Sequence, residues 1–119
     1  YNKEGYSFDD MLGYCEAFIE DGVDILDVST GGDSPIRPIV YPGYQVKYAK
    51  AIRDKFGIPV MSVGKLENPE VAEMVIRDEF ADFVCIGKGM LRNPYWAKEA
   101  AIALGAELKM PGVYDQGFD

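Results

Sequence analysis

The sequence contains no histidine and only two cysteines among its 119 residues. Without histidine, the chain lacks the usual proton shuttle of enzymes and the most common zinc ligand. The two cysteines, Cys15 and Cys85, fall inside apolar periodic segments, where buried reduced thiols are more common than disulfides or metal ligands. We therefore predict neither a metal site nor a disulfide framework.

Basic residues are also few, since 12 lysines and arginines stand against 20 acidic residues, for a net charge of -8. Binding to nucleic acid or to an anionic membrane depends on basic surface that displaces counterions, so we expect neither partner. Any anion must be held by a local arrangement of donors. No apolar run reaches about 18 residues, and the first residues, YNKEGYSFDD, lack the basic-then-apolar order of a signal peptide. We therefore expect a cytoplasmic protein.

Helical and extended patterns alternate along the chain. Four segments carry apolar residues at helical spacing: 8–21, 44–56, 69–80 and 94–104. Three short segments rich in β-branched residues lie between them: 23–30 (VDILDVST), 58–64 (IPVMSVG) and 81–88 (ADFVCIGK). Strands separated by helical crossovers predict an α/β fold with a parallel sheet and right-handed connections.

Capping residues mark where these helices begin. Ser7 is suited to cap the first helix, and the pair Asn68-Pro69 supplies a cap and a first-turn proline for the third. The same pair recurs at Asn93-Pro94 and predicts the start of the fourth helix. Beyond that helix no periodicity is clear, so we expect residues 105–119 to form an irregular tail of a single partial domain, 1–119.

The strand patterns favour a barrel over an open sheet. Within DILDVS, Ile25, Asp27 and Ser29 alternate with Leu26 and Val28, so one face of this strand is mixed. A sheet covered by helices on both faces prefers apolar residues on each, whereas a barrel strand accepts inward polar residues near the active-site end. Eight β/α units normally need about 250 residues. We therefore expect about three strands and four helices, the C-terminal portion of a TIM (β/α)8 barrel.

The same alternation, applied to all three strands, predicts an inner sheet face that includes Ile25, Val60, Ser62, Phe83 and Cys85. A three-stranded sheet also has two open edges. Because exposed apolar faces and unpaired edges drive association, we expect either a homo-oligomer or a helix of the same chain folded over this face.

Two successive strands end in a glycine followed by a lysine. MSVGKL places Gly64 and Lys65 after the second strand, and CIGKGML places Gly87 and Lys88 after the third. The loops after the last two strands of a barrel commonly bind phosphate, because glycine lets backbone N–H groups approach the oxygens and a basic side chain adds charge. A single Gly-Lys pair is more often a turn with a solvated lysine, but two in register favour an anion site.

Several of these segments resemble one known family. GVDILDVSTGG, YPGYQVKYAKAIR, the SVG after IPV, and ADFVCIGKGMLRNPYWAKEAA are similar to the C-terminal part of the old yellow enzyme family, the FMN-dependent NAD(P)H:flavin oxidoreductases and ene-reductases. The resemblance covers nearly the whole chain. It implies an FMN-binding (β/α)8 barrel whose last three strands are DILDVS, PVMSVG and FVCIGK. It also implies that Gly64, Gly87 and the side chain of residue 88 contact the FMN phosphate.

Two positions depart from the family pattern. Family members usually carry arginine where this chain has Lys88, and an arginine grips phosphate through two hydrogen bonds whereas an ammonium is a point charge. In the similar branch a tail arginine reaches into a neighbouring subunit, but the tail here, Tyr114-Asp-Gln-Gly-Phe118, has Gln116 at that position. The family's substrate-binding His/Asn or His/His pair and its proton-donating tyrosine have no counterpart in this chain, so we assign no catalytic residue.

The resemblance implies that the parent enzyme uses NAD(P)H to reduce FMN, which then passes hydride to a small activated alkene such as an enone. We expect this chain to contribute the phosphate-binding end of the barrel and to be inactive alone. An alternative remains, namely a non-catalytic α/β module that associates with itself through its exposed sheet face. Bound flavin would favour the first interpretation, and a colourless oligomer would favour the second.

Overall fold

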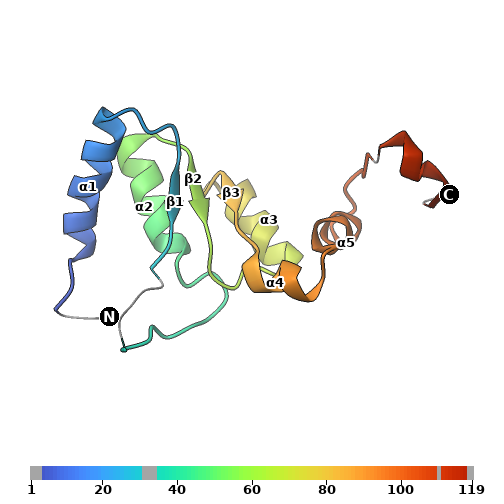
Figure 1. Cartoon of the computed structure of the whole chain (residues 1–119), viewed down its shortest axis with the longest axis horizontal. Helices are drawn as coiled ribbons and strands as arrows, with labels where there is room; N and C mark the ends of the chain where they lie inside the picture. The colour runs from blue at the N-terminus through green and yellow to red at the C-terminus, as the bar shows by residue number, and fades with distance from the viewer. Residues whose placement is uncertain (1–3, 31–34, 110, 118–119) are drawn as a thin grey trace. The chain divides into compact units, whose positions relative to one another are not determined.

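The computed structural model describes residues 4–30, 35–109 and 111–117. Three strands form a parallel sheet in sequential order: β1 (Leu26–Val28), β2 (Val60–Ser62) and β3 (Phe83–Val84). Helices precede and separate them: α1 (Phe8–Glu20), α2 (Val46–Phe56) and α3 (Pro69–Arg77) (Figure 1). Right-handed crossovers in a sequential sheet put α2 and α3 on the same face. The predicted α/β class with parallel β/α units is confirmed.

The chain divides into two compact units, Tyr1–Ile86 and Gly87–Asp119. The first holds the sheet with α1, α2 and α3. The second holds α4 (Gly87–Arg92), α5 (Trp96–Ala103) and a 3-10 helix, η1 (Gly112–Gly117). Neither α4 nor η1 was predicted from the sequence, because each is too short to show a helical period.

The predicted N-caps of the first and third helices are confirmed. Ser7 Oγ accepts from Asp10 N at 3.1 Å and Ser7 N donates to Asp10 Oδ2 at 2.8 Å, which makes a reciprocal capping box. The hydrogen bonds from the Ser7 hydroxyl and then from its N–H lower the pKa of Asp10. Asn68 Oδ1 accepts from two N–H groups in the first turn of α3. Both helix starts are therefore determined locally.

The second Asn-Pro pair does not cap a helix as predicted. Asn93 N donates to Gly89 O at 2.9 Å, which extends the last turn of α4. Its side-chain Oδ1 accepts from Tyr95 N at 3.0 Å and so closes a turn. α5 begins only at Trp96, with Tyr95 as an N-cap that makes no side-chain hydrogen bond. The backbone of Asn93 thus ends α4, while its side chain bonds Tyr95 N just before α5 and Glu99 Oε2 within it.

The core of the first unit lies between one face of the sheet and the helices. Its buried members come from α1, α2, α3, the strands and the adjoining loops: Cys15, Val28, Val46, Ala49, Ile52, Ile58, Val60, Leu66, Val75 and Ala81. Burial raises the pKa of the Cys15 thiol, so this cysteine is an uncharged part of the core at neutral pH. Both cysteines are free.

The pairing register decides which strand residues face this core. Leu26 pairs with Val60, and Val28 pairs with Ser62, so all four share one face. Val60 and Ser62 are both 0% exposed. The prediction that these two residues line the uncovered inner face is therefore wrong. Alternation within one strand does not say which face is covered until its register with the neighbouring strand is known.

The opposite, uncovered face carries Asp27, Met61 and Phe83, which pair across the three strands. Phe83 is 54% exposed. Cys85 shares this face, as predicted, and its Sγ lies 4.0 Å from Met61 Sδ. Partial burial, and secondarily the charge of Asp27, raise the pKa of the Cys85 thiol. The face therefore combines apolar surface, an uncharged thiol and one carboxylate.

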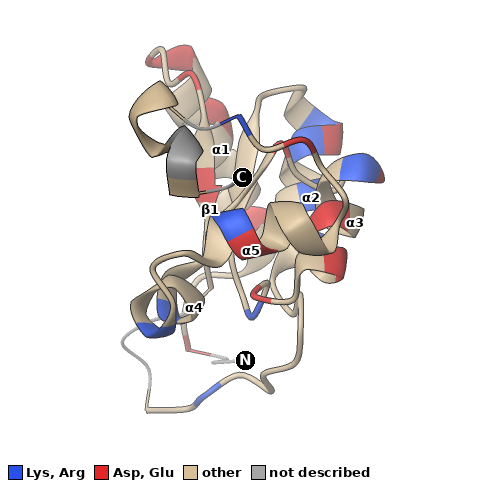
Figure 2. Ribbon diagram, turned by 90° about the vertical axis from the view of Figure 1, so that its right-hand side faces the viewer, with Lys and Arg blue, Asp and Glu red and all other residues tan. Residues whose placement is uncertain are grey.

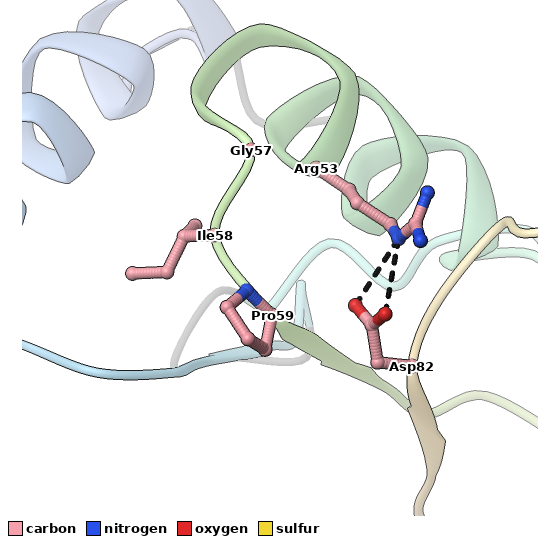
Figure 3. A pocket seen from close by; sticks show the side chains of 5 residues that line it. All are labelled: Arg53, Gly57, Ile58, Pro59 and Asp82. Atoms are coloured by element: carbon pink, nitrogen blue, oxygen red, sulfur yellow. Dashed lines mark hydrogen bonds and ion pairs between the residues drawn. The ribbon is translucent and has the colours of Figure 1, made fainter.

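An ion pair joins α2 to the amino ends of the strands. Arg53 Nε lies 3.2 Å from both carboxylate oxygens of Asp82, and Asp82 Oδ2 also accepts from Val60 N at 2.9 Å. Figure 3 shows the pair beside Gly57, Ile58 and Pro59, with which it lines a shallow hollow. Ligands of parallel α/β sheets bind at the carboxyl ends of the strands. We therefore interpret this amino-end network as structural.

The variant Asp82→Asn should lower the free energy of unfolding by about 1–2 kcal/mol, because it removes the charge that pairs with a partly buried guanidinium. Urea unfolding followed by circular dichroism measures the change. Asp54→Asn is the matched control, since the Lys50–Asp54 pair is 2.6 Å long but its side chains are 42% and 52% exposed. Asp54→Asn should lower the free energy of unfolding by less than about 0.5 kcal/mol. Equal, small losses from both variants would contradict the structural role.

Candidate functional site

The carboxyl ends of β1 and β2 bring three loop segments together within the first unit. We call their residues the carboxyl-edge cluster: Thr30, Gly43, Tyr44, Gln45, Gly64 and Lys65. Gly43 N donates to Gly64 O at 2.8 Å, which holds the loop before α2 against the turn after β2. Since this edge is where parallel α/β sheets bind ligands, the cluster is the candidate site.

The turn after β2 requires glycine at its first position. Gly64 is buried and has a φ of +120. A Cβ built on it would lie 3.0 Å from Gln45 Nε2 and 3.0 Å from Tyr44 Cε1. Lys65 follows with a φ of 53 and is exposed. The backbone thus bends sharply between two packed side chains and presents the lysine to solvent.

Gln45 is one of the residues of this cluster that were not predicted from the sequence as site residues. It is only 3% exposed. Its Oε1 accepts hydrogen bonds from Thr30 N and, at 3.0 Å, from Thr30 Oγ1. One signal in the sequence could have revealed it, because Gln45 precedes Ala49 and Ile52 at helical spacing. A polar residue therefore extends the apolar stripe of α2.

The second predicted Gly-Lys pair lies in the other unit. Strand pairing continues past the end of β3, because Cys85 N donates to Ser62 O at 2.8 Å. Gly87 and Lys88, which were expected to end this strand, instead open α4, and both are exposed. Lys88 and Arg92 are the basic residues of this helix (Figure 2). Gly64 and Lys65 thus belong to the carboxyl-edge cluster. Gly87 and Lys88 are instead the first two residues of α4.

No family model matches this chain. Curated relatives do match, and among them are several bacterial proteins named NADPH dehydrogenase. The protein from Geobacillus thermodenitrificans is 42% identical over 118 residues, and those from Listeria innocua and Listeria welshimeri are 40% and 39% identical over 118 residues. The chain is similar to these bacterial dehydrogenases over 99% of its length. It spans 35% of the length of each of these relatives.

Two features are absent from the described residues. No group of three or more histidine, cysteine, aspartate or glutamate side chains in them could hold a metal ion. None of the helices in residues 4–30, 35–109 and 111–117 is long and apolar enough to cross a bilayer. The side chain of Gln116, like Phe118, lies outside the described part, as does the glycine-rich stretch 31–34 after β1.

The variant Gly64→Ala should lower the free energy of unfolding by about 2–4 kcal/mol, because an L side chain is strained at this φ and its Cβ would displace Gln45 and Tyr44. Gly13→Ala is the matched control, since Gly13 lies inside α1 and a Cβ there would meet nothing within 4 Å. The control should stabilise the protein by about 0.5–1 kcal/mol. Denaturant unfolding of both variants measures these changes. An unchanged stability of Gly64→Ala would contradict the close packing of Gln45 and Tyr44 against Gly64.

Proposed function

We propose that this chain forms the phosphate-binding, C-terminal end of an FMN-dependent (β/α)8-barrel oxidoreductase that uses NADPH. The observation that carries the proposal is the Gly64-Lys65 turn at the carboxyl edge of a parallel sheet. Similarity to proteins named NADPH dehydrogenase supports the oxidoreductase class and the reductant. The resemblance to the old yellow enzyme family supports FMN as the group that is bound.

The donor set of the carboxyl-edge cluster fits a phosphate. Its six residues include no carboxylate and one lysine, although the chain as a whole has a net charge of -8. Gly64 leaves the backbone of the turn unshielded by a side chain of its own, and Lys65 supplies an exposed ammonium beside it. Backbone N–H groups and a neighbouring cation are the usual ligands of phosphate oxygens.

From the family resemblance, we also propose that Gly87 and Lys88 contact phosphate. Lys88 would supply a point charge. At position 88 the family's arginine would make two hydrogen bonds to phosphate, whereas the lysine ammonium makes a single charged contact.

FMN, when bound, would supply hydride transfer from NADPH to an activated alkene such as an enone. The residues of this chain would hold its phosphate end and exclude water from it. The uncovered sheet face with Asp27, Met61 and Phe83 would line the barrel interior. We assign no catalytic residue to this chain, and we expect no turnover from it alone.

Flavin binding with and without the phosphate tests the proposal. The wild-type chain should bind FMN more tightly than riboflavin, which lacks the phosphate. Lys65→Ala and Lys88→Ala should each weaken FMN binding by about 1–3 kcal/mol and leave riboflavin binding unchanged. Quenching of flavin fluorescence measures both affinities. Lys55→Ala is the matched control, because Lys55 lies in the last turn of α2, away from the carboxyl-edge cluster. Equal affinity of the wild type for the two flavins would overturn the phosphate site.

One observation favours the alternative of a self-associating module. Phe83 is 54% exposed on the uncovered sheet face, opposite Met61 in the strand pairing. If this face associates, Phe83→Asp should convert an oligomer to a monomer in light scattering at micromolar concentration. Leu91→Asp is the control, since Leu91 is 85% exposed on α4. A wild-type chain that is already monomeric would exclude this alternative.

A further inference from the structure

We propose that Gln45 is a positioning residue for the anion-binding turn. Its buried carboxamide would hold the Gly64 turn in the conformation that presents Lys65 to a phosphate. This inference rests on the proposed phosphate site, and it adds a residue outside both Gly-Lys pairs. It follows from the burial of Gln45, from its bonds to Thr30 and from the position of its Nε2, 3.0 Å from where a Cβ on Gly64 would lie.

Gln45 is buried although its amide is polar, so its role must involve the hydrogen bonds of that amide. Among the described residues only Gln45 and Ser62 are polar and buried. A buried amide is unfavourable unless it is hydrogen-bonded, whereas a leucine or methionine would fill the same space at the head of α2 without that cost. Packing alone therefore gives no reason for glutamine at this position.

The hydrogen bonds of Gln45 determine which end of its amide faces the turn. Thr30 offers two donors, its N–H and its hydroxyl, and both go to Oε1. The reversed amide would place an NH2 group against the Thr30 N–H, which is unfavourable. The Nε2 end is thereby directed at Gly64, where a Cβ would lie only 3.0 Å away. The positive end of the amide dipole thus borders the turn.

The loop that carries Gln45 also orients the turn's backbone. Gly43 N donates to Gly64 O at 2.8 Å, and the structure contains no cis peptide among its described residues. In a trans peptide the carbonyl and the following N–H point in opposite directions. Since the Gly64 carbonyl points toward Gly43, the Lys65 N–H points away from that loop. Gly43 therefore holds the carbonyl of Gly64, and Gln45 packs beside its Cα.

Gln45 thus connects three segments that are distant in sequence. Thr30 follows β1, Gln45 precedes α2, and Gly64 follows β2. Loss of the carboxamide would leave the segments in place through core packing but would free the turn to change its conformation. The expected consequence is weaker phosphate binding with little effect on contacts to the rest of a flavin.

The variant Gln45→Met tests this role, because it keeps the side-chain length and removes the hydrogen bonds. We expect the preference of the 119-residue chain for FMN over riboflavin to fall about tenfold, the scale of one lost charge-assisted or buried hydrogen bond. Riboflavin affinity should stay within about twofold of wild type. A merely structural role would weaken both flavins equally, so the ratio of the two dissociation constants separates the roles.

A second variant and a second readout cover the case in which Gln45→Met folds poorly. Thr30→Val removes the hydroxyl bond to Gln45 and keeps the bond from the Thr30 N–H, so it should lower the same ratio to a smaller extent. In 15N-labelled protein, inorganic phosphate should shift the amide signals of Gly64 and Lys65, and Gln45→Met should reduce those shifts. An unchanged ratio and unchanged shifts in both variants would overturn the role of Gln45 and leave the phosphate site standing. Absence of any preference or shift in the wild type would instead overturn the phosphate site, and the inference with it.

Discussion

The strand register, in which Leu26 pairs with Val60 and Met61 pairs with Phe83, determines which residues of the first unit face the helices. It puts Val28, Val60 and Ser62 against the helices and leaves Asp27, Met61 and Phe83 on the other face. Because all strands are parallel and in sequential order, their carboxyl ends meet at one edge. Every residue of the carboxyl-edge cluster reaches its place because of that alignment.

The two edges of the sheet have different roles. At the amino ends, Asp82 joins the Arg53 guanidinium to the N–H of Val60, and this network ties α2 to the sheet. At the carboxyl ends, the loops contain glycines with positive φ and an exposed lysine. The amino edge therefore carries a charge pair, whereas the carboxyl edge carries a glycine turn packed against Tyr44 and Gln45 beside an exposed lysine.

An acidic chain that holds an anion must do so with few groups. The net charge of -8 makes the average field of the chain repulsive to phosphate. Hydrogen-bond donors close to the anion then decide whether it binds, because the energy of these bonds depends on distance and direction more than on the net charge of the chain. A buried amide such as that of Gln45 therefore matters to the proposed site as well as the charge of Lys65.

Local chemistry in the sequence was sufficient for the α/β class, the helix starts at Ser7 and Asn68, and the turn at Gly64, because caps, periodicity and glycine conformations involve residues close in sequence. The faces of Val60 and Ser62 and the burial of Gln45 were decided only by the tertiary structure. Each depends on a partner brought near by folding: Leu26 for Val60, Val28 for Ser62, and Thr30 for Gln45. Sequence patterns record which residues are apolar or flexible, but they do not record which distant segment lies alongside, and hydrogen bonds and strand register are set by that neighbour.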